Sequence, residues 1–173
     1  MSRVLIIGYG NPLRRDDGFG CHVAQQLETY WTSPEIEIVA CHQLTPELAE
    51  PLSWADYAVF VDAAEQNPPG ELCFDHVAPA QDGFGAFSHH VSAAALLANA
   101  ESLFGSHPME SFLVSVNGSD FGFGEGMSEC VERQLPIAIE GINQLISEWT
   151  LEAASFSRTN LQSPFSTSGA KYA

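Results

Sequence analysis

The sequence predicts an α/β fold, in which a three-layer arrangement places a mainly parallel sheet of about five strands between helices. Short apolar runs alternate along the chain with longer segments whose apolar residues recur every three or four positions. The apolar runs are continuous, which is typical of strands buried on both faces. The length of 173 residues suffices for one domain with its own hydrophobic core.

The first half of the chain predicts three strands and two helices. The strands are Val4–Ile7, Ile36–Cys41 and Tyr57–Asp62. The first helix follows Asp16 and Asp17, whose negative charges are favourable at its N-terminus. The residues expected on its apolar face are Phe19, Val23, Leu27 and either Tyr30 or Trp31. A short second helix is expected to begin at Thr45, with Pro46 in its first helical position.

The second half predicts an edge strand, a helix, a further strand and a long helix. Glu71–His76 alternates in polarity and suits an edge strand. Val91–Phe104 is an alanine-rich helix, and Phe112–Val116 is an apolar strand. The pattern over Ser128–Trp149 is that of a long amphipathic helix, which Pro136 is expected to kink or restart. Its expected apolar face comprises Val131, Leu135, Ile139, Ile142 and Ile146.

Composition limits the partners and the compartment. Residues 1–154 are expected to form the domain, and the Ser/Thr-rich residues 155–173 a mobile or loosely docked tail. Twenty-two acidic against six basic residues give a net charge of −16, which repels nucleic acid and anionic membranes. No apolar stretch is long enough for a signal-peptide core or a membrane span. Four widely spaced cysteines indicate free thiols in a reducing cytoplasm.

The loop after the first strand, Gly8–Gly18, is similar to a dinucleotide-binding loop only in part. Leu13 stands where the third glycine of that motif is needed, and the second strand ends in Cys41-His42 with no acid to hold a ribose. Asp16 and Asp17 would also repel a pyrophosphate. A nucleotide cofactor is therefore not expected.

The residues best suited to chemistry follow the predicted strands, at the edge of the sheet where sites form in such folds. Asp16 and Asp17 exceed what a helix cap needs, and Asp62 would be costly to bury unpaired. One of His89 and His90 could join them, since two carboxylates and an imidazole suit a divalent first-row ion. Capping and backbone hydrogen bonding are the structural alternatives. For a hydrolase, metal-activated water is the simplest chemistry that remains.

Three segments together carry a family resemblance. They are Gly8-x-Gly-Asn-x-Leu-x-x-Asp-Asp-x-x-Gly20, an apolar strand ending in Asp62-Ala, and Ser88-x-His90 before a helix. This pattern, between Arg3 and Trp149, resembles the [NiFe] hydrogenase maturation endopeptidases. The resemblance implies a twisted, mainly parallel sheet between helices.

The resemblance also implies a function. Members remove the C-terminal extension of the nickel-loaded large-subunit precursor of a [NiFe] hydrogenase, so that precursor is the expected partner and its nickel the recognised metal. Metal contact and catalysis then fall on Asp17, Asp62 and His90, and Asp16 is a candidate base or supporting residue. Aspartic and metal-dependent hydrolysis both stay open. A non-catalytic metal-binding chaperone or sensor for hydrogenase assembly is the alternative function.

The segment after the second strand departs from the common family pattern. Many members have an Asp-Gly-Gly-Thr-like sequence there, whereas this chain has His42-Gln43-Leu44-Thr45. A His-Gln-Leu segment is similar to members that serve bidirectional, NAD-linked hydrogenases. His42, Gln43 and Leu44 are therefore expected to contact the substrate, and a loop that merely packs is the alternative.

Overall fold

The structure is a computed structural model that describes residues 2–81 and 91–159, with side chains up to residue 151. Five strands form one sheet in the order β2-β1-β3-β5-β4. The first four of these pair in parallel, and β4 runs antiparallel to β5 at the edge. The strands are β1 (Val4–Tyr9), β2 (Ile36–Cys41), β3 (Tyr57–Ala64), β4 (Leu72–His76) and β5 (Glu110–Asn117). The predicted fold class is thus confirmed, including the edge strand.

Helices connect and cover the strands. They are η1 (Arg15–Gly18), α1 (Phe19–Tyr30), η2 (Pro46–Leu48), α2 (Ala49–Trp54), α3 (Ala93–Phe104), α4 (Glu129–Glu132) and α5 (Leu135–Thr159). Pro136 lies in the first turn of α5, where the missing N–H breaks no helical hydrogen bond. It therefore restarts the helix, one of the two expected outcomes. Helix α5 continues past residue 154, the expected end of the domain, and residues 160–173 lie outside the described part.

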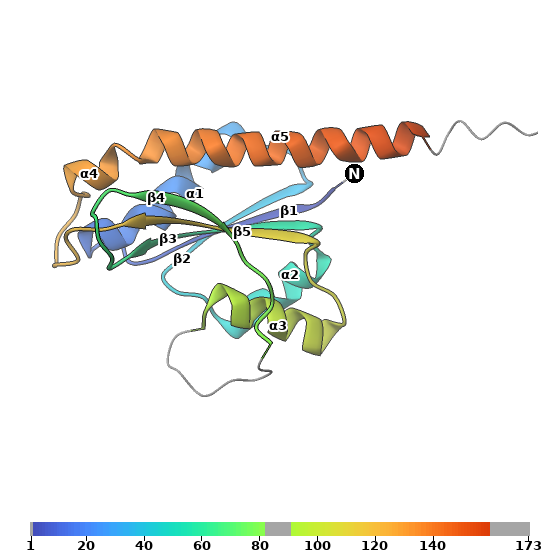
Figure 1. Cartoon of the computed structure of the whole chain (residues 1–173), viewed down its shortest axis with the longest axis horizontal. Coiled ribbons are helices and arrows are strands. Elements are labelled where there is room, and N and C mark those ends of the chain that lie inside the picture. The colour runs from blue at the N-terminus through green and yellow to red at the C-terminus, as the bar shows by residue number, and fades with distance from the viewer. Residues whose placement is uncertain (1, 82–90, 160–173) are drawn as a thin grey trace, which may run out of the picture.

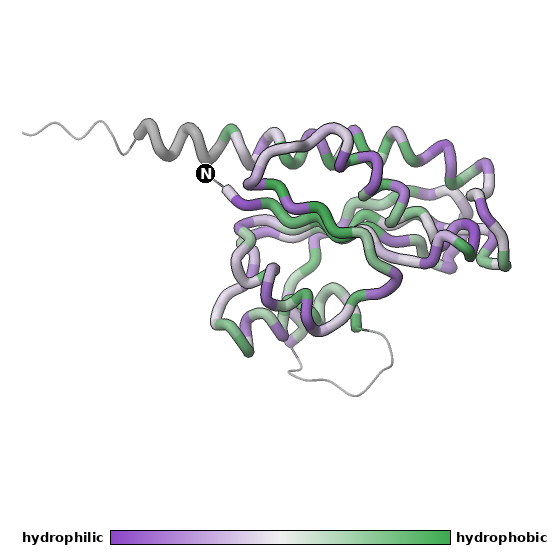
Figure 2. Tube along the Cα trace, turned by 180° about the vertical axis from the view of Figure 1, so that it is seen from behind, coloured by the Kyte–Doolittle hydropathy of each residue, from purple (hydrophilic) through white to green (hydrophobic). Residues whose placement is uncertain are grey.

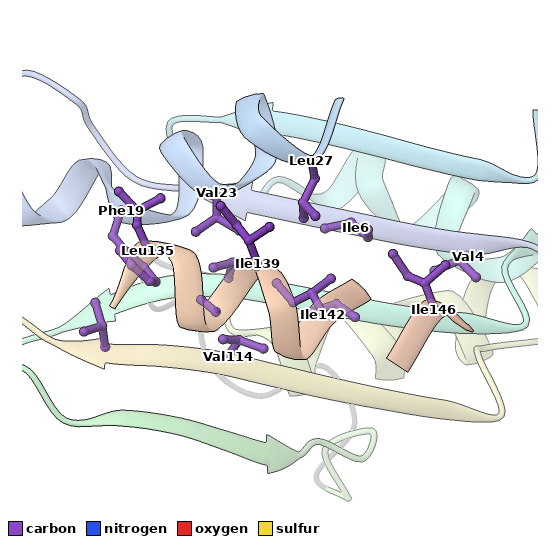
Figure 3. Packing of buried hydrophobic residues seen from close by; sticks show 14 of the residues in the cluster. Val4, Ile6, Phe19, Val23, Leu27, Val114, Leu135, Ile139, Ile142 and Ile146 are labelled. Carbon is purple, nitrogen blue, oxygen red and sulfur yellow. The ribbon is translucent and has the colours of Figure 1, made fainter. Parts of the chain in front are cut away.

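Two hydrophobic clusters hold the layers together, one on each face of the sheet. Figure 1 shows α1 and α5 on one face and α2 and α3 on the other. The first cluster joins β1, β3 and β5 to α1 and α5, and it contains all five apolar positions expected along Ser128–Trp149. Figure 3 shows the four of these that lie on α5, Leu135, Ile139, Ile142 and Ile146, directed at the sheet. On α1 the expected face is confirmed, with Trp31 rather than Tyr30 packed against the cluster.

The second cluster lies between the opposite face and α2 and α3, and it uses Leu5 and Ile7 of β1. Because both neighbours of Ile6 point into this cluster while Ile6 points into the first, β1 is buried on both faces, as its continuous apolar run predicts. Figure 2 shows the strands as a hydrophobic band between more polar helices. All four cysteines are free thiols. Within the described residues, no helix has the length and apolar character needed to cross a membrane.

Glycines let α1 start against the ends of two strands. A Cβ on Gly20 would lie 2.2 Å from the carbonyl oxygen of Val61 and 2.5 Å from that of Tyr9. A Cβ on Gly8 would lie 2.0 Å from the carbonyl oxygen of Gly20. The motif glycines therefore permit the close packing that places the loop before α1 beside β3.

Replacing Gly20 by Ala is expected to lower the free energy of unfolding by about 2–4 kcal/mol, because the new methyl group overlaps backbone atoms that cannot rotate away. Urea denaturation at neutral pH measures this change. Gly105→Ala is the control: Gly105 has a φ of 73° but no neighbour within 4 Å of the added Cβ, so backbone conformation alone costs about 1–2 kcal/mol there. Equal losses at the two positions would contradict the packing argument.

Candidate active site

A pocket of about 650 Å³ opens at the ends of β1 and β3 where the chain leaves the sheet. In a parallel sheet these are the carboxyl ends, the edge at which sites form. The pocket brings Asp17 and Asp62 together with residues of the β2–η2 loop and the start of α3. The lining residues are Tyr9, Gly10, Asn11, Arg14, Asp17, His42, Gln43, Leu44, Asp62, Ala63, Val91, Ser92, Ala93 and Leu113.

Asp62 is a half-buried carboxylate inside β3, which continues two residues beyond it to Ala64. Its Oδ1 accepts a hydrogen bond from the backbone N–H of Ala63 (2.7 Å), and the Tyr9 hydroxyl donates a second one. Burial raises the pKa of Asp62 to about 6. The two hydrogen bonds lower the pKa in part, and the nearby negative charge of Asp17 raises it further. A carboxyl with such a pKa can exchange a proton near neutral pH.

Tyr9 is a site residue that the sequence did not point to. It is the last residue of β1, its side chain lines the pocket, and it hydrogen-bonds Asp62. Burial, followed by the charge of Asp62, raises the pKa of the phenol well above its usual range, so the hydroxyl stays protonated and can only act there as a donor to the carboxylate. The signal available was its position: a tyrosine two residues beyond the predicted strand Val4–Ile7, beside another predicted strand that carries an acid.

Asp17 lies in η1, immediately before α1. Its Oδ2 accepts a hydrogen bond from the backbone N–H of Asn11 (2.8 Å), which ties it to the turn after β1. Gly10 makes this turn possible, since its φ is 130° and a Cβ there would lie 1.8 Å from the carbonyl oxygen of Asp17. The motif residues Gly10, Asn11 and Asp17 thus form one unit whose carboxylate borders the pocket.

Asp16, which the sequence offered as a candidate base or supporting residue, is surrounded by hydrogen-bond donors of the loop between β5 and α4. It is completely buried, and its carboxylate accepts hydrogen bonds from the backbone N–H groups of Ser119 (2.8 Å), Asp120 (2.9 Å) and Ser128 (2.6 Å). The Ser128 hydroxyl donates another (2.8 Å). Burial raises the pKa of Asp16, but the hydrogen bonds led by Ser128 outweigh it and leave the pKa below its ordinary value. These contacts, three at Oδ2 and one at Oδ1, fit a supporting role, one of the two roles that the sequence left open for Asp16.

The segment His42-Gln43-Leu44 borders the same pocket as the two acids. His42 and Gln43 are exposed at its rim, whereas Leu44 is 4% exposed and belongs to the second hydrophobic cluster. Leu44 therefore anchors the loop, and the two polar residues are the ones available to a ligand.

His90, the third expected ligand, lies outside the described residues, as do His89 and Ser88. Val91, Ser92 and Ala93, which follow in the sequence, line the pocket. Among the described residues, no three His, Cys, Asp or Glu side chains form a metal-binding group. The two carboxylates at the pocket supply oxygen donors that suit part of a divalent metal site.

Several known proteins of similar sequence or structure are named as hydrogenase maturation proteases. No protein-family model matches the chain. It is 26% identical over 156 residues to the hydrogenase 2 maturation protease of Escherichia coli (strain K12), covering 87% of this chain and 94% of that protein. The structure of the hydrogenase maturating endopeptidase HybD from E. coli superimposes with a TM-score of 0.71 at 24% identity, covering 84% of this chain and 93% of the other.

A second solved structure, the [NiFe] hydrogenase maturation protease HycI from Thermococcus kodakarensis, superimposes with a TM-score of 0.68 at 24% identity over 84% of this chain and 93% of that one. Each of these matches covers more than four fifths of this chain. In sequence and in fold, the chain is therefore similar to hydrogenase maturation proteases, the family that its motif between Gly8 and Gly20 resembles.

Proposed function

We propose that the chain is a cytoplasmic endopeptidase that removes the C-terminal extension of the large-subunit precursor of a [NiFe] hydrogenase. The observation that carries this proposal is the pocket in which Asp17 and Asp62 meet at the ends of β1 and β3. Water supplies the hydroxyl of the new carboxyl terminus and the hydrogen of the released amine. The names of the relatives, which are proteases, favour hydrolysis over the alternative of a non-catalytic metal chaperone or sensor.

We further propose that Asp17, Asp62 and His90 recognise the nickel that the precursor already carries. The pocket is open to solvent, so the shape of a peptide alone would not restrict which cellular proteins are cleaved. A second feature of the substrate is needed for selectivity. The oxygen donors of Asp17 and Asp62 supply part of a coordination shell, and the residues directly after His90 line the same pocket. Nickel, which belongs to the substrate, would then restrict cleavage to precursors that have been loaded.

The expected result is that nickel-loaded precursor is cleaved at least about tenfold faster than metal-free precursor at limiting concentration, a difference of about 1.4 kcal/mol. Intact-mass measurement of the large subunit over time reports cleavage. Asp17→Ala and His90→Ala should each remove cleavage, while His89→Ala should not. Equal rates on loaded and empty precursor would refute nickel recognition, and an uncut loaded precursor would refute the protease assignment.

The exposed side chains of His42 and Gln43 are proposed to contact the client subunit, since they form a polar part of the pocket rim. The His-Gln-Leu segment supports a bidirectional, NAD-linked hydrogenase as that client. A comparison of purified precursors from bidirectional and uptake-type hydrogenases as substrates tests the subtype. Preference for the uptake-type precursor would argue against it.

A further inference from the structure

The loop between β5 and α4, residues 118–128, is fastened along its length to the turn after β1. The backbone N–H of Gly124 donates to the carbonyl oxygen of Leu13 (2.9 Å), and the Nε of Arg14 donates to the carbonyl oxygen of Phe121 (3.2 Å). Arg14 and Gly124 form a parallel β-bridge. Figure 1 shows this loop at the left end of the molecule, where the strands of the parallel sheet end.

The two ends of the same loop are also fixed, by hydrogen bonds and an ion pair. Buried Asp16 accepts the three backbone N–H groups from Ser119, Asp120 and Ser128 described above. Arg15 adds an ion pair with Asp120, with Nε 3.3 Å from Oδ2. Ordered loops of this kind keep their shape when a partner binds, so little conformational entropy is lost on association.

Two large apolar side chains project from these fastened loops. Phe123 is 89% exposed and Leu13 is 57% exposed. The backbones that carry them lie side by side, since Gly124, the neighbour of Phe123, is hydrogen-bonded to Leu13. The Arg14 and Arg15 side chains both bond to this loop. We call Leu13 and Phe123 the apolar ledge.

We propose that the apolar ledge docks the folded body of the substrate protein whose C-terminal segment enters the pocket. The inference rests on the proposed function and adds the surface that binds the body of the substrate. Arg14, the residue after Leu13, lines the pocket, so the ledge is continuous with the pocket rim. A folded protein that places its tail in the pocket must lay its surface on that rim. Aromatic side chains are enriched at the centres of such interfaces.

The test compares variants for binding and cleavage of nickel-loaded precursor. Phe123→Ser, alone and with Leu13→Ser, should raise KM and the dissociation constant at least about tenfold while leaving kcat unchanged. Phe123→Leu keeps an apolar side chain and should stay within about threefold of wild type. The matched control is Leu103→Ser, because Leu103 is 59% exposed near the end of α3 and should have no effect. Binding is measured by calorimetry, and molecular mass by light scattering.

The outcomes separate this inference from the proposed function. Normal cleavage and binding by Phe123→Ser would overturn the ledge and leave the protease assignment intact. If wild type binds the precursor without cutting it and Phe123→Ser binds more weakly, the ledge stands and the protease assignment falls. A wild-type dimer that Phe123→Ser dissociates, with KM unchanged, would overturn the proposal in favour of a second copy of this chain. Absence of binding by wild type would overturn both.

Discussion

Replacing Asp62 by Asn is expected to remove cleavage and to stabilise the fold at neutral pH. Burial raises the pKa of Asp62 to about 6. Between the ordinary carboxyl pKa of about 3.9 and about 6, the unfolded chain releases this proton while the folded chain keeps it, so stability falls as the pH rises through that window. The whole shift is worth about 3 kcal/mol. Asn has one acceptor oxygen for the two donors, Ala63 N–H and Tyr9 O–H, which costs about 1 kcal/mol.

The net expectation is a gain of about 2 kcal/mol in the free energy of unfolding at about pH 7.5, which turns into a small loss of less than about 1 kcal/mol near pH 4, where the hydrogen-bond cost outweighs what remains of the gain. Urea denaturation in metal-free buffer at both pH values measures it, and intact mass of the precursor measures cleavage, which should fall at least about 100-fold. Asp75→Asn, on the exposed edge strand β4, is the matched control and should change stability by less than about 0.5 kcal/mol. A destabilised Asp62→Asn would mean that the carboxylate supports the fold, and undiminished cleavage would remove it from the site.

The fold was predictable because its signals are local. The apolar run Val4–Ile7 and the spacing of Ile139, Ile142 and Ile146 each report burial within a few residues of sequence, and the structure buries all of them. Parallel pairing then brings the ends of β1 and β3 to one edge, so Asp17 and Asp62 meet without any further information. That much of the site follows from topology alone.

The rest of the site depends on contacts between distant segments. Asp16 and Asp17 are adjacent and chemically identical, and nothing local says which of them faces the pocket. The difference arises because the donors on Ser119 and Ser128 come from a loop that lies 103 and 112 residues further along the chain. The hydrogen bond from Tyr9 to Asp62 likewise joins two strands. Side-chain hydrogen bonds of this range have no signature in residue spacing.

Asp16 is expected to show the opposite behaviour to Asp62. Asp16→Asn should lower the free energy of unfolding by about 3 kcal/mol or more, because the amide NH2 would face buried donors of Ser119, Asp120 and Ser128.

The pKa of Asp16 is lowered in the folded chain, whereas that of Asp62 is raised. The stabilisation by the Asp16 carboxylate is therefore present above about pH 4 and is lost on further acidification. Urea denaturation between neutral pH and about pH 2 should show this loss in wild type and not in the variant. Ser128→Ala, which removes the hydroxyl donor alone, should cost about 1 kcal/mol. If Asp16→Asn kept its stability but lost cleavage, Asp16 would belong to the chemistry and its assignment as the support of the loop would be wrong.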